Sequence, residues 1–560
     1  MSRGTHLAFV LLLPAAHAAV RFNYNAQTLP LADRMVLQRA PQRARVWGTS
    51  DDANGTVAVT VTASNGTELA STEVRVNSTD STWTAELPPI EAASGATVSA
   101  SDLANASAPA AILSDVAIGE VLLCSGQSNM QFKIEGSSEF LLIGNRTSYW
   151  ELPDVRMLDA VTSRLSSIVA TDAPLAAPAP PVDLLGDDMP SGWWKANSTL
   201  TFTFSAICYD VGRAVHESYG VPVGLVASAV GGTPIEAWTR QSAVETCPDA
   251  VAIGQNKSAG SLFKSYVEPL APMTFRAVVW DQGENNFCAG PAANPDLTGP
   301  VLWKAYSCMF PAMITDWRAV FETPELPFVY VELCMAPNAD WWATGHMAFW
   351  LAQRAAMALD RVGFATTTDL QQLVHPPNKT AVGARLVREL RRVAFGAGAA
   401  SAPARGPEVL AASRVDNDTI RVTLSNASSS LFVAEGFLAC DSGSAEAMVP
   451  GSAEAKQCAS VPAKQLVDPP SCRGGPTRES PFICDEGELG ASDYFNASRT
   501  AATWAFDDDG TVLVRGCGAR GVTLNQVARY DAGNGTVGPC TLYGSTGLPA
   551  VPENITKLLD

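Results

Sequence analysis

The sequence predicts an α/β protein: a doubly wound parallel sheet flanked by one β-domain before it and another after it. Two observations lead to this prediction. In the middle of the chain, apolar runs of strand length alternate with segments of helical periodicity, as in sheets covered by helices on both faces. Before and after that region, apolar and polar residues alternate one by one between turn residues, which is typical of antiparallel strands. With 560 residues, the chain is too long for one compact core, so several domains are expected.

Residues 1–18 have the order of a cleaved signal peptide. Arg3 precedes the apolar run Leu7–Leu13, and Ala16-His17-Ala18 follows it. The run is too short to cross a bilayer, and no later stretch of about 18 apolar residues is free of charges and breakers, so no membrane span is expected. Twelve cysteines and thirteen Asn-x-Ser/Thr triplets, from Asn54 to Asn554, then favour a disulfide-bonded protein with N-linked glycans, secreted or lysosomal.

Charge and metal-ligand patterns exclude two classes of function. Lys and Arg number 38 against 56 Asp and Glu, a net charge of −18, which argues against nucleic-acid binding. No Cys-x-x-Cys and no His-Glu-x-x-His occurs, and after residue 18 only His216, His346 and His375 remain. We therefore expect neither a metal site nor an organic cofactor.

Three regions follow the signal peptide. Residues 19–113 form the first β-domain, as the alternation Thr56–Thr62 and the turn signal Asn65-Gly66 indicate. Residues 402–560 form the second, with alternation at Thr419–Leu424 and Thr511–Val514. The segment Cys440–Cys484 is dense enough in cysteine to be held by disulfides, whose pairing the sequence does not give.

Residues 114–401 form the central domain. Its predicted buried strands are Val121–Cys124, Gly224–Val230, Ala277–Trp280, Phe328–Leu333 and Val362–Thr367. Its predicted helices are Ser205–Tyr219, Ala305–Phe321, Ala348–Leu359 and Ala381–Phe395, and Thr171–Pro190 is expected to be a surface excursion. In such a sheet, ligands bind beyond the carboxyl ends of the strands.

Four polar segments stand at those strand exits or just before a helix. They are Cys124–Met130, Val230–Trp238, Trp280–Asn286 and His375–Lys379. Each has an ordinary structural interpretation: a turn serine, a glycine turn, a solvated loop with a helix cap, and a helix start. Together they supply a serine, paired glycines, an asparagine and a histidine, which are the nucleophile, oxyanion donors and base that acyl transfer needs. The α/β-hydrolase elbow Gly-x-Ser-x-Gly is absent, because Met130 stands where its second glycine would be.

These segments closely resemble the sialate O-acetylesterase family, a member of the SGNH hydrolases. The flanks agree, from Arg34–Gln38 and Val46-Trp47-Gly48 to Leu542-Tyr543-Gly544 and Gly547–Ala550. The resemblance implies an SGNH-type fold with Ser128 as nucleophile and His375 as general base. It further implies that the oxyanion donors are the Ser128 N–H, the Gly231 or Gly232 N–H and the Asn286 side chain. It implies that the substrate-binding residues are Gln127, Asn129, Gln282 and Glu284. Alternatively, Glu284 is structural and holds the Asn286 loop.

The chain departs from the family at three positions. Many relatives carry Asp three residues before the histidine, where this chain has Gln372. Asp369 is our candidate for orienting His375; a backbone carbonyl or Gln372 itself would instead give a Ser–His dyad. The family often has Ser at Asn285 and an aromatic residue at Asp281. Asn378 also begins a glycosylation triplet beside the base, and we expect it to be unoccupied or to point outward.

The sequence thus predicts a secreted serine esterase, without cofactor, that removes O-acetyl groups from sialic acids. An acetylesterase for another carbohydrate such as xylan is the first alternative, and a glycan-binding protein with a decayed hydrolase core is the second. A sialate enzyme should present a cation to the substrate carboxylate, and Arg240 and Lys379 are the candidates. Activity should fall below roughly pH 6–7 as the histidine protonates, and Asn286→Ala should cost roughly 10²–10³ in turnover without unfolding the protein.

Overall fold

The computed structural model describes most of the chain before residue 397 and short strands after it. The described residues are 20–23, 30–105, 108–143, 147–161, 192–197, 200–288, 299–333, 349–367, 370, 375–396, 409–424 and strands between 432 and 554. The predicted signal peptide, the excursion at 171–190 and residues 440–481 of the cysteine-rich segment lie outside them. None of the described helices has both the length and the apolar character needed to cross a bilayer.

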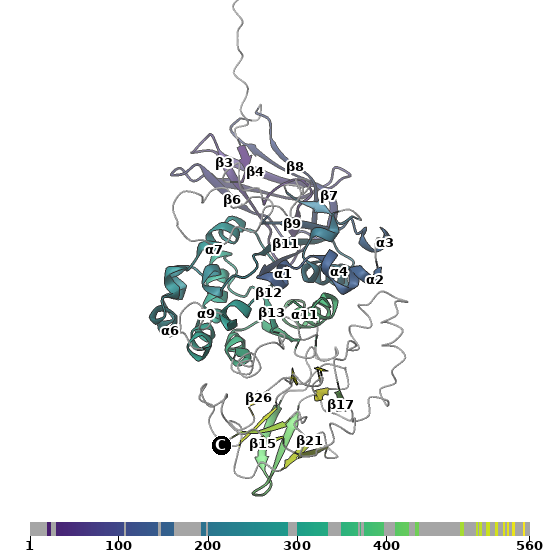
Figure 1. Ribbon diagram of the computed structural model, residues 1–560. Coiled ribbons are helices and arrows are strands. Elements are labelled where there is room, and N and C mark those ends of the chain that lie inside the picture. The colour runs from purple at the N-terminus through teal and green to yellow at the C-terminus, as the bar shows by residue number, and fades with distance from the viewer. Residues whose placement is uncertain are drawn as a thin grey trace, which may run out of the picture.

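The N-terminal region consists of antiparallel strands, as predicted (Figure 1). One sheet has the order β1-β3-β6; its strands are β1 (Val20–Phe22), β3 (Arg45–Ser50) and β6 (Thr82–Glu86). A second group pairs around a long strand, β8; it comprises β2 (Val36–Gln38), β4 (Thr56–Thr62), β5 (Glu68–Arg75), β7 (Ala93–Asp102) and β8 (Ala111–Gly126). Within β4, Val57, Val59 and Val61 are buried while the threonines between them are not, which is the two-residue period of a strand with one face in the core.

Strand β8 continues from the N-terminal strands into the central sheet without a break. Its first half pairs with β7 in antiparallel fashion, and residues 117–119 pair with β2. Residues 120–126 pair in parallel with β11 (Val223–Ala229), and residues 122–126 with β12 (Ala277–Asp281). The boundary expected between residues 113 and 114 therefore falls inside one strand.

The central sheet has the order β10-β9-β11-β8-β12-β13-β14. The remaining strands are β9 (Val155–Asp159), β10 (Trp194–Lys195), β13 (Phe328–Glu332) and β14 (Val362–Thr366). Neighbours from β9 to β14 are parallel, and β10 adds an antiparallel edge. All five predicted central strands form. β9 was not predicted, because Arg156 interrupts its apolar run; the residue is buried and its guanidinium donates to the carbonyls of Arg34 and Asp115.

Helices cover both faces of this sheet, and alternate residues of β8 point to opposite sides. Leu122 and Cys124 lie in a core shared with α4 (Ala206–Tyr219) and α11 (Lys379–Val393). Val121 and Leu123 lie in the core shared with α9 (Gly299–Val320) and α7 (Ser261–Tyr266). Helix α11 begins two residues earlier than predicted, since the Asn378 side chain accepts from the Ala381 N–H and caps it. Helix α9 begins six residues earlier than predicted.

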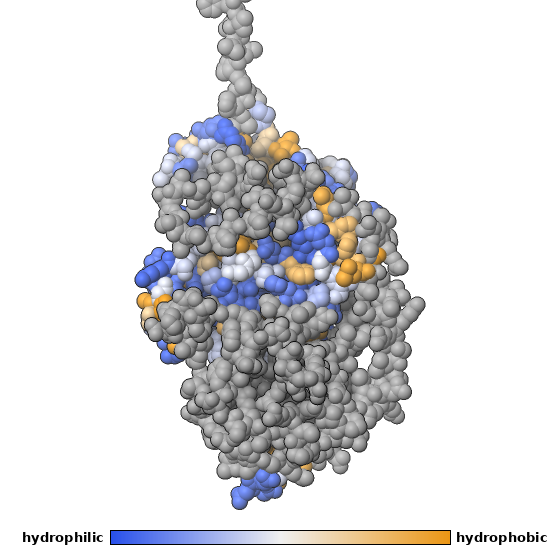
Figure 2. Space-filling view, viewed as in Figure 1, coloured by the Kyte–Doolittle hydropathy of each residue, from blue (hydrophilic) through white to orange (hydrophobic). Residues whose placement is uncertain are grey.

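Short helices connect the larger elements. They are α1 (Ser128–Gln131), η1 (Ile134–Gly136), α2 (Ser138–Ile143), α3 (Thr147–Trp150), η3 (Thr201–Thr203), η4 (Ile235–Trp238), α5 (Gln241–Val244), α6 (Pro248–Ala252), η5 (Gln255–Lys257), η6 (Glu268–Leu270), α8 (Glu284–Cys288) and η7 (Ala355–Ala358). In the view of Figure 2, hydrophilic residues form a band across the described surface, and apolar colour gathers over the region of α2 and α3. Leu141 of α2 is the most exposed of the large apolar side chains described.

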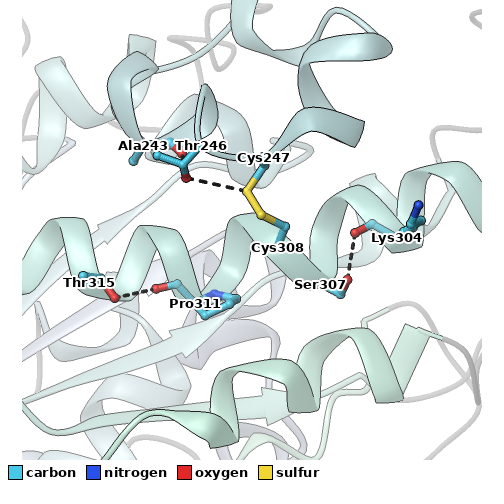
Figure 3. The surroundings of a disulfide bond; sticks show 8 residues. All are labelled: Ala243, Thr246, Cys247, Lys304, Ser307, Cys308, Pro311 and Thr315. Atoms are coloured by element: carbon cyan, nitrogen blue, oxygen red, sulfur yellow. Dashed lines mark hydrogen bonds between the residues drawn. A yellow bond between two sulfur atoms is a disulfide. The ribbon is translucent and has the colours of Figure 1, made fainter.

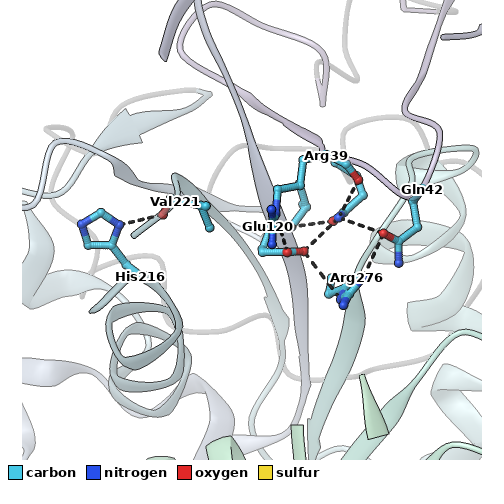
Figure 4. A network of polar contacts seen from close by, with 8 residues as sticks. Arg39, Gln42, Glu120, His216, Val221 and Arg276 are labelled. Atoms are coloured by element: carbon cyan, nitrogen blue, oxygen red, sulfur yellow. Dashed lines mark hydrogen bonds and ion pairs between the residues drawn. The ribbon is translucent and has the colours of Figure 1, made fainter. Parts of the chain in front are cut away.

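Two disulfides and a buried ion pair tie distant segments together. Cys124 of β8 is bonded to Cys208 of α4, and Cys247 before α6 is bonded to Cys308 of α9 (Figure 3). Glu120 of β8 is fully buried, and it accepts from Arg39 Nε at 2.7 Å and from Gln38 Nε2 at 2.9 Å (Figure 4). The contacts of Glu120 with Arg39 and Gln38 join the N-terminal region to the central sheet.

The described part of the C-terminal region is all β, as predicted. One antiparallel sheet has the order β15-β16-β21-β20; its strands are β15 (Val409–Arg414), β16 (Thr419–Leu424), β21 (Thr511–Arg515) and β20 (Thr503–Phe506). The other strands are β17 (Phe432–Glu435) with β25 (Cys540–Tyr543); β19 (Thr500–Ala501), β18 (Phe482–Asp485), β22 (Gly521–Leu524) and β26 (Glu553–Asn554); and β23 (Tyr530–Asp531) with β24 (Gly535–Thr536).

Candidate active site

Ser128 follows the carboxyl end of β8, between the ends of β11 and β12. After β8 the chain builds one side of the sheet and later crosses to the other, and such a reversal of strand order is where α/β sheets bind ligands. Ser128 opens helix α1 after a sharp turn at Gly126, whose φ is +137°. A Cβ at Gly126 would lie 2.1 Å from the Asp281 carbonyl oxygen, so only glycine fits. The same carbonyl accepts from the Gln127 N–H at 2.9 Å.

His375 meets this serine from the other end of the central domain. Its Nε2 lies 2.8 Å from Ser128 Oγ, although 247 residues separate them. Ser128 is partly exposed and the imidazole is exposed, so an external molecule can reach the pair. Partial burial and the positive charge of Lys379 lower the pKa of His375 below its usual 6.5. A neutral imidazole at this distance can take the serine proton.

Asp369 and Gln372, the residues expected to orient His375, lie outside the described residues. Within the described part of the chain, no carboxylate is bonded to the imidazole.

Of the two glycines after β11, Gly231 lies against Ser128, and the two differ in their hydrogen bonds. A Cβ on Gly231 would come 3.4 Å from Ser128 Cβ, and the Gly231 N–H already donates to Gln131 Oε1 at 2.8 Å. Gly232 is exposed with φ +71°, and no described residue accepts from its N–H. Of the two glycine N–H groups, that of Gly232 is thus the one left for a bound oxyanion.

The neighbouring asparagines also differ. Asn286 is 1% exposed; its Oδ1 accepts from Ile235 N–H and Gln282 Nε2, and its Nδ2 donates to Glu236 Oε2 at 2.9 Å. Asn285 is less buried; its Nδ2 donates to the Gly232 carbonyl at 2.7 Å, and its N–H donates to Gln127 Oε1 at 3.3 Å. The structure therefore brings Asn285 to the glycine turn and uses Asn286 to hold η4. The sequence signal for Asn285 was its departure from the family's serine.

Four other residues expected around a substrate are buried beneath the serine. The side chains of Gln127, Asn129, Gln282 and Glu284 are all nearly inaccessible. Asn129 Nδ2 donates to Glu284 Oε1, and Gln282 Nε2 donates to the Thr233 carbonyl at 3.1 Å. Burial raises the pKa of Glu284 above its usual range. In this structure these four side chains contact protein groups and form the floor of the site.

Both cations expected to meet a substrate carboxylate are engaged elsewhere. Arg240 donates from Nε and Nη2 to Asp316 at 2.6–3.1 Å. The Lys379 ammonium donates to Asn129 Oδ1 and is buried. Among the described residues there is also no group of three or more His, Cys, Asp or Glu side chains placed to hold a metal ion.

Comparison with known proteins agrees with this chemistry. Residues 184–390 match the family model for carbohydrate esterases described as sialic acid-specific acetylesterases, a range that includes His375 but not Ser128. Human sialate O-acetylesterase is 31% identical over 300 residues, 51% of this chain and 51% of that protein. The Rattus norvegicus sialate O-acetylesterase is 30% identical over 360 residues, 57% of this chain and 60% of that protein.

The matched region is shorter than these relatives: the chain spans about half the length of the curated proteins it matches first, 51% in each case. A crystal structure of a carbohydrate acetylesterase from Xanthomonas citri superposes with a TM-score of 0.64 at 24% identity, covering 94% of this chain and 98% of the other. That likeness extends over nearly the whole chain and supports the fold.

Proposed function

We propose that the chain, which resembles the sialate O-acetylesterases over about half its length, is a serine esterase, a carboxylic ester hydrolase with an SGNH-type core, that removes O-acetyl groups from sialic acids. The observation that carries this proposal is the 2.8 Å contact between Ser128 Oγ and His375 Nε2. A hydroxyl and a neutral imidazole in hydrogen-bond contact at an accessible strand exit are the minimum that acyl transfer requires.

The proposed reaction has two halves. His375 Nε2 takes the Ser128 proton while Oγ attacks the acetyl carbonyl, and the sugar oxygen then leaves with that proton. A water molecule gives its proton to the same imidazole, attacks the acetyl-serine and releases acetate. The charge on the tetrahedral oxygen is stabilised by N–H donors. For these we propose Ser128 and Gly232 N–H, since the Gly231 N–H is already bonded to Gln131. For the side-chain donor we propose Asn285, which is less buried and contacts the Gly232 turn, whereas Asn286 is 1% exposed.

The orientation of His375 is part of the same proposal. Asp369 remains our candidate for the carboxylate behind the imidazole. If Asp369→Asn leaves the rate of acetate release unchanged, the enzyme works as a Ser–His dyad and not as a triad.

One observation favours a second substrate. Sialic acids carry a carboxylate, yet Arg240 is paired with Asp316 and Lys379 with Asn129. An uncharged acetylated sugar, such as one from xylan, would need neither cation. A glycan-binding protein without activity is the third possibility; the accessible Ser128–His375 pair speaks against it.

The test is acetate release from a panel of acetylated sialic acids and acetylated neutral glycans. Ser128→Ala should lose essentially all activity and all labelling by a fluorophosphonate, since among the described residues no other hydroxyl contacts the imidazole. Ser265→Ala, an exposed serine of α7, is the matched control and should behave as wild type. Activity on neutral glycans alone would select the alternative substrate, and wild-type rates in Ser128→Ala would rule out the esterase.

We also propose that the protein follows the secretory route to the lysosome or the extracellular space and carries N-linked glycans. The two buried disulfides support this, since disulfides persist in oxidising compartments. Asn65 and Asn77 are exposed and can accommodate glycans, whereas Asn378 caps α11 beside the site. A shift in mass on glycosidase treatment of the secreted protein tests this.

A further inference from the structure

Lys379 is a buried lysine in the first turn of α11, four residues after His375. It is 1% exposed, its ammonium donates to Asn129 Oδ1, and Nζ lies 4.9 Å from the centre of the Phe132 ring. Lysines are almost never fully buried unless they are paired, because removing an ammonium from water is costly. The cost of burying this ammonium therefore suggests that Lys379 has a specific role at this position.

The partners of Lys379 form a chain beneath the nucleophile. Asn129, which accepts from Lys379, in turn donates a hydrogen bond from Nδ2 to Glu284 Oε1. Asp281, at the end of β12, is buried beside this group; burial raises the pKa of both carboxyls, and the Lys379 charge opposes the rise. The ammonium thus lies near two acidic side chains, and Asn129 fixes its distance from the turn that bears Ser128.

Two consecutive residues, Ser128 and Asn129, contact His375 and Lys379 respectively. Since Ser128 and Asn129 are adjacent in the chain, the imidazole and the ammonium contact the nucleophile turn at neighbouring residues. The positive charge opposes protonation of the imidazole and, after burial, is the second cause of the lowered pKa of His375.

We propose that Lys379 is a positioning residue of the proposed esterase reaction: its ammonium holds the Ser128 turn through Asn129 and keeps His375 available as a base in acidic solution. The inference rests on the proposed roles of Ser128 and His375. The Lys379 charge therefore shifts the acid limb of activity to lower pH than the roughly 6–7 expected for an unperturbed histidine. The inference also excludes Lys379 as the partner of a substrate carboxylate.

Other charges surround this start of α11. Asp281 and Glu284 face it from β12 and α8. On the other side, Thr380 Oγ1 donates to Glu139 Oε2 at 2.6 Å, and Glu139 is next to Asp210 and Arg213 of α4. Because the Lys379 charge also lowers the pKa of Asp281 and Glu284, its effect on His375 has to be measured at the imidazole itself.

The experiment compares the full secreted chain with Lys379→Gln and Lys379→Met. Gln keeps a donor for Asn129 Oδ1 but removes the charge, and Met removes both. The acid limb of kcat/KM for an aryl acetate should move to higher pH in both variants, by about half a unit or more for the loss of one nearby charge. At acidic pH both should therefore be several-fold slower than wild type, and Lys379→Gln should recover toward alkaline pH. Arg391→Met, a cation near the other end of α11, should leave the limb in place.

A second readout does not depend on turnover. In a Ser128→Ala background, NMR titration of the His375 imidazole should give a higher pKa with Lys379→Gln than with Lys379. An unchanged imidazole pKa together with an unmoved acid limb would overturn the inference. Should wild type show no Ser128-dependent hydrolysis, the proposed function fails, and the NMR titration alone decides the role of Lys379. If Lys379→Met does not fold, Lys379→Gln still gives both readouts.

Discussion

Asn285 and Asn286 show how far adjacent residues of one type can differ in what they do. Asn286 makes three buried hydrogen bonds that join α8 to η4 and to Gln282 after β12, whereas Asn285 contacts the exposed Gly232 turn. Removing a buried hydrogen-bond partner costs about 1–3 kcal/mol, because the groups left behind have no water to replace it.

We therefore expect Asn285→Ala and Asn286→Ala to fail in different ways. Asn285→Ala should lower kcat by roughly 10²-fold, as loss of an oxyanion donor does, with little change in melting temperature. Asn286→Ala should lower the free energy of unfolding by about 1–3 kcal/mol, so its loss of activity should follow the loss of folded protein. Steady-state kinetics and calorimetry on both variants separate the two. A stable but inactive Asn286→Ala would restore Asn286 as the oxyanion donor.

Ser128 and His375 were predicted from the coincidence of four polar segments and from the family resemblance, and the structure brings their side chains into contact. The sequence was not sufficient for Lys379 or Asn286. A lysine is exposed by default, whereas this one is interior and contacts Asn129, 250 positions away, and the Phe132 ring. Whether Asn285 or Asn286 faces the serine depends on how α8 leaves β12, and residue types do not encode that rotation.

Two acidic side chains, Glu139 and Asp210, are buried next to each other where α2, α4 and α11 pack together. Asp210 of α4 is buried beside Glu139 of α2, and burial followed by the charge of Glu139 raises its pKa well above the usual value. Glu139 in turn accepts from Tyr149 and Thr380. A carboxyl with a raised pKa holds its proton in the folded state, so it stabilises the fold at acidic pH and loses that contribution as the pH rises through the folded-state pKa.

Asp210→Asn, which imitates the protonated acid, should consequently match wild type near pH 4 and exceed it in melting temperature by a growing margin as the pH rises from there. Glu73→Gln, an exposed position on β5, makes the same change in net charge away from this site and should give no such pH-dependent gain. Thermal melts across that pH range provide the measurement. A constant difference between Asp210→Asn and wild type at every pH would show that Asp210 is ionised in the folded protein.

Helices and strands of the centre were the most predictable elements, since their periodicity extends over whole segments. All five predicted strands are present, and the predicted helices differ mainly at their ends. Where prediction failed, one polar residue was responsible. Arg156 interrupts the apolar pattern of β9. Its buried guanidinium is tolerated there because it donates hydrogen bonds to the backbone carbonyls of Arg34 and Asp115.

The arrangement of the larger units was predicted in part. Composition changes near residue 113, and the sequence therefore suggested two separate units, but β8 carries hydrogen bonds straight through that point. The buried Glu120 network links the same two regions through Arg39. Hydrogen bonding between strands far apart in the chain leaves no trace in local composition, so the continuity could not be seen in advance.

Arg39→Met should test that continuity. Breaking the 2.7 Å pair with the fully buried Glu120 should cost about 3 kcal/mol, and the N-terminal strands and the central sheet should melt together at a lower temperature in one calorimetric transition. Arg43→Met, which breaks a half-exposed pair with Glu86, should cost less than about 1 kcal/mol. Two transitions of which only one moves would mean that the regions unfold separately.

The uninterrupted course of β8 also limits how such a protein can be recombined. A chimera that joins this N-terminal region to another hydrolase core at the compositional boundary would cut a strand in two. It would also leave Arg39 and Gln38 without Glu120. The two regions should therefore be inherited together and exchanged, if at all, as one piece.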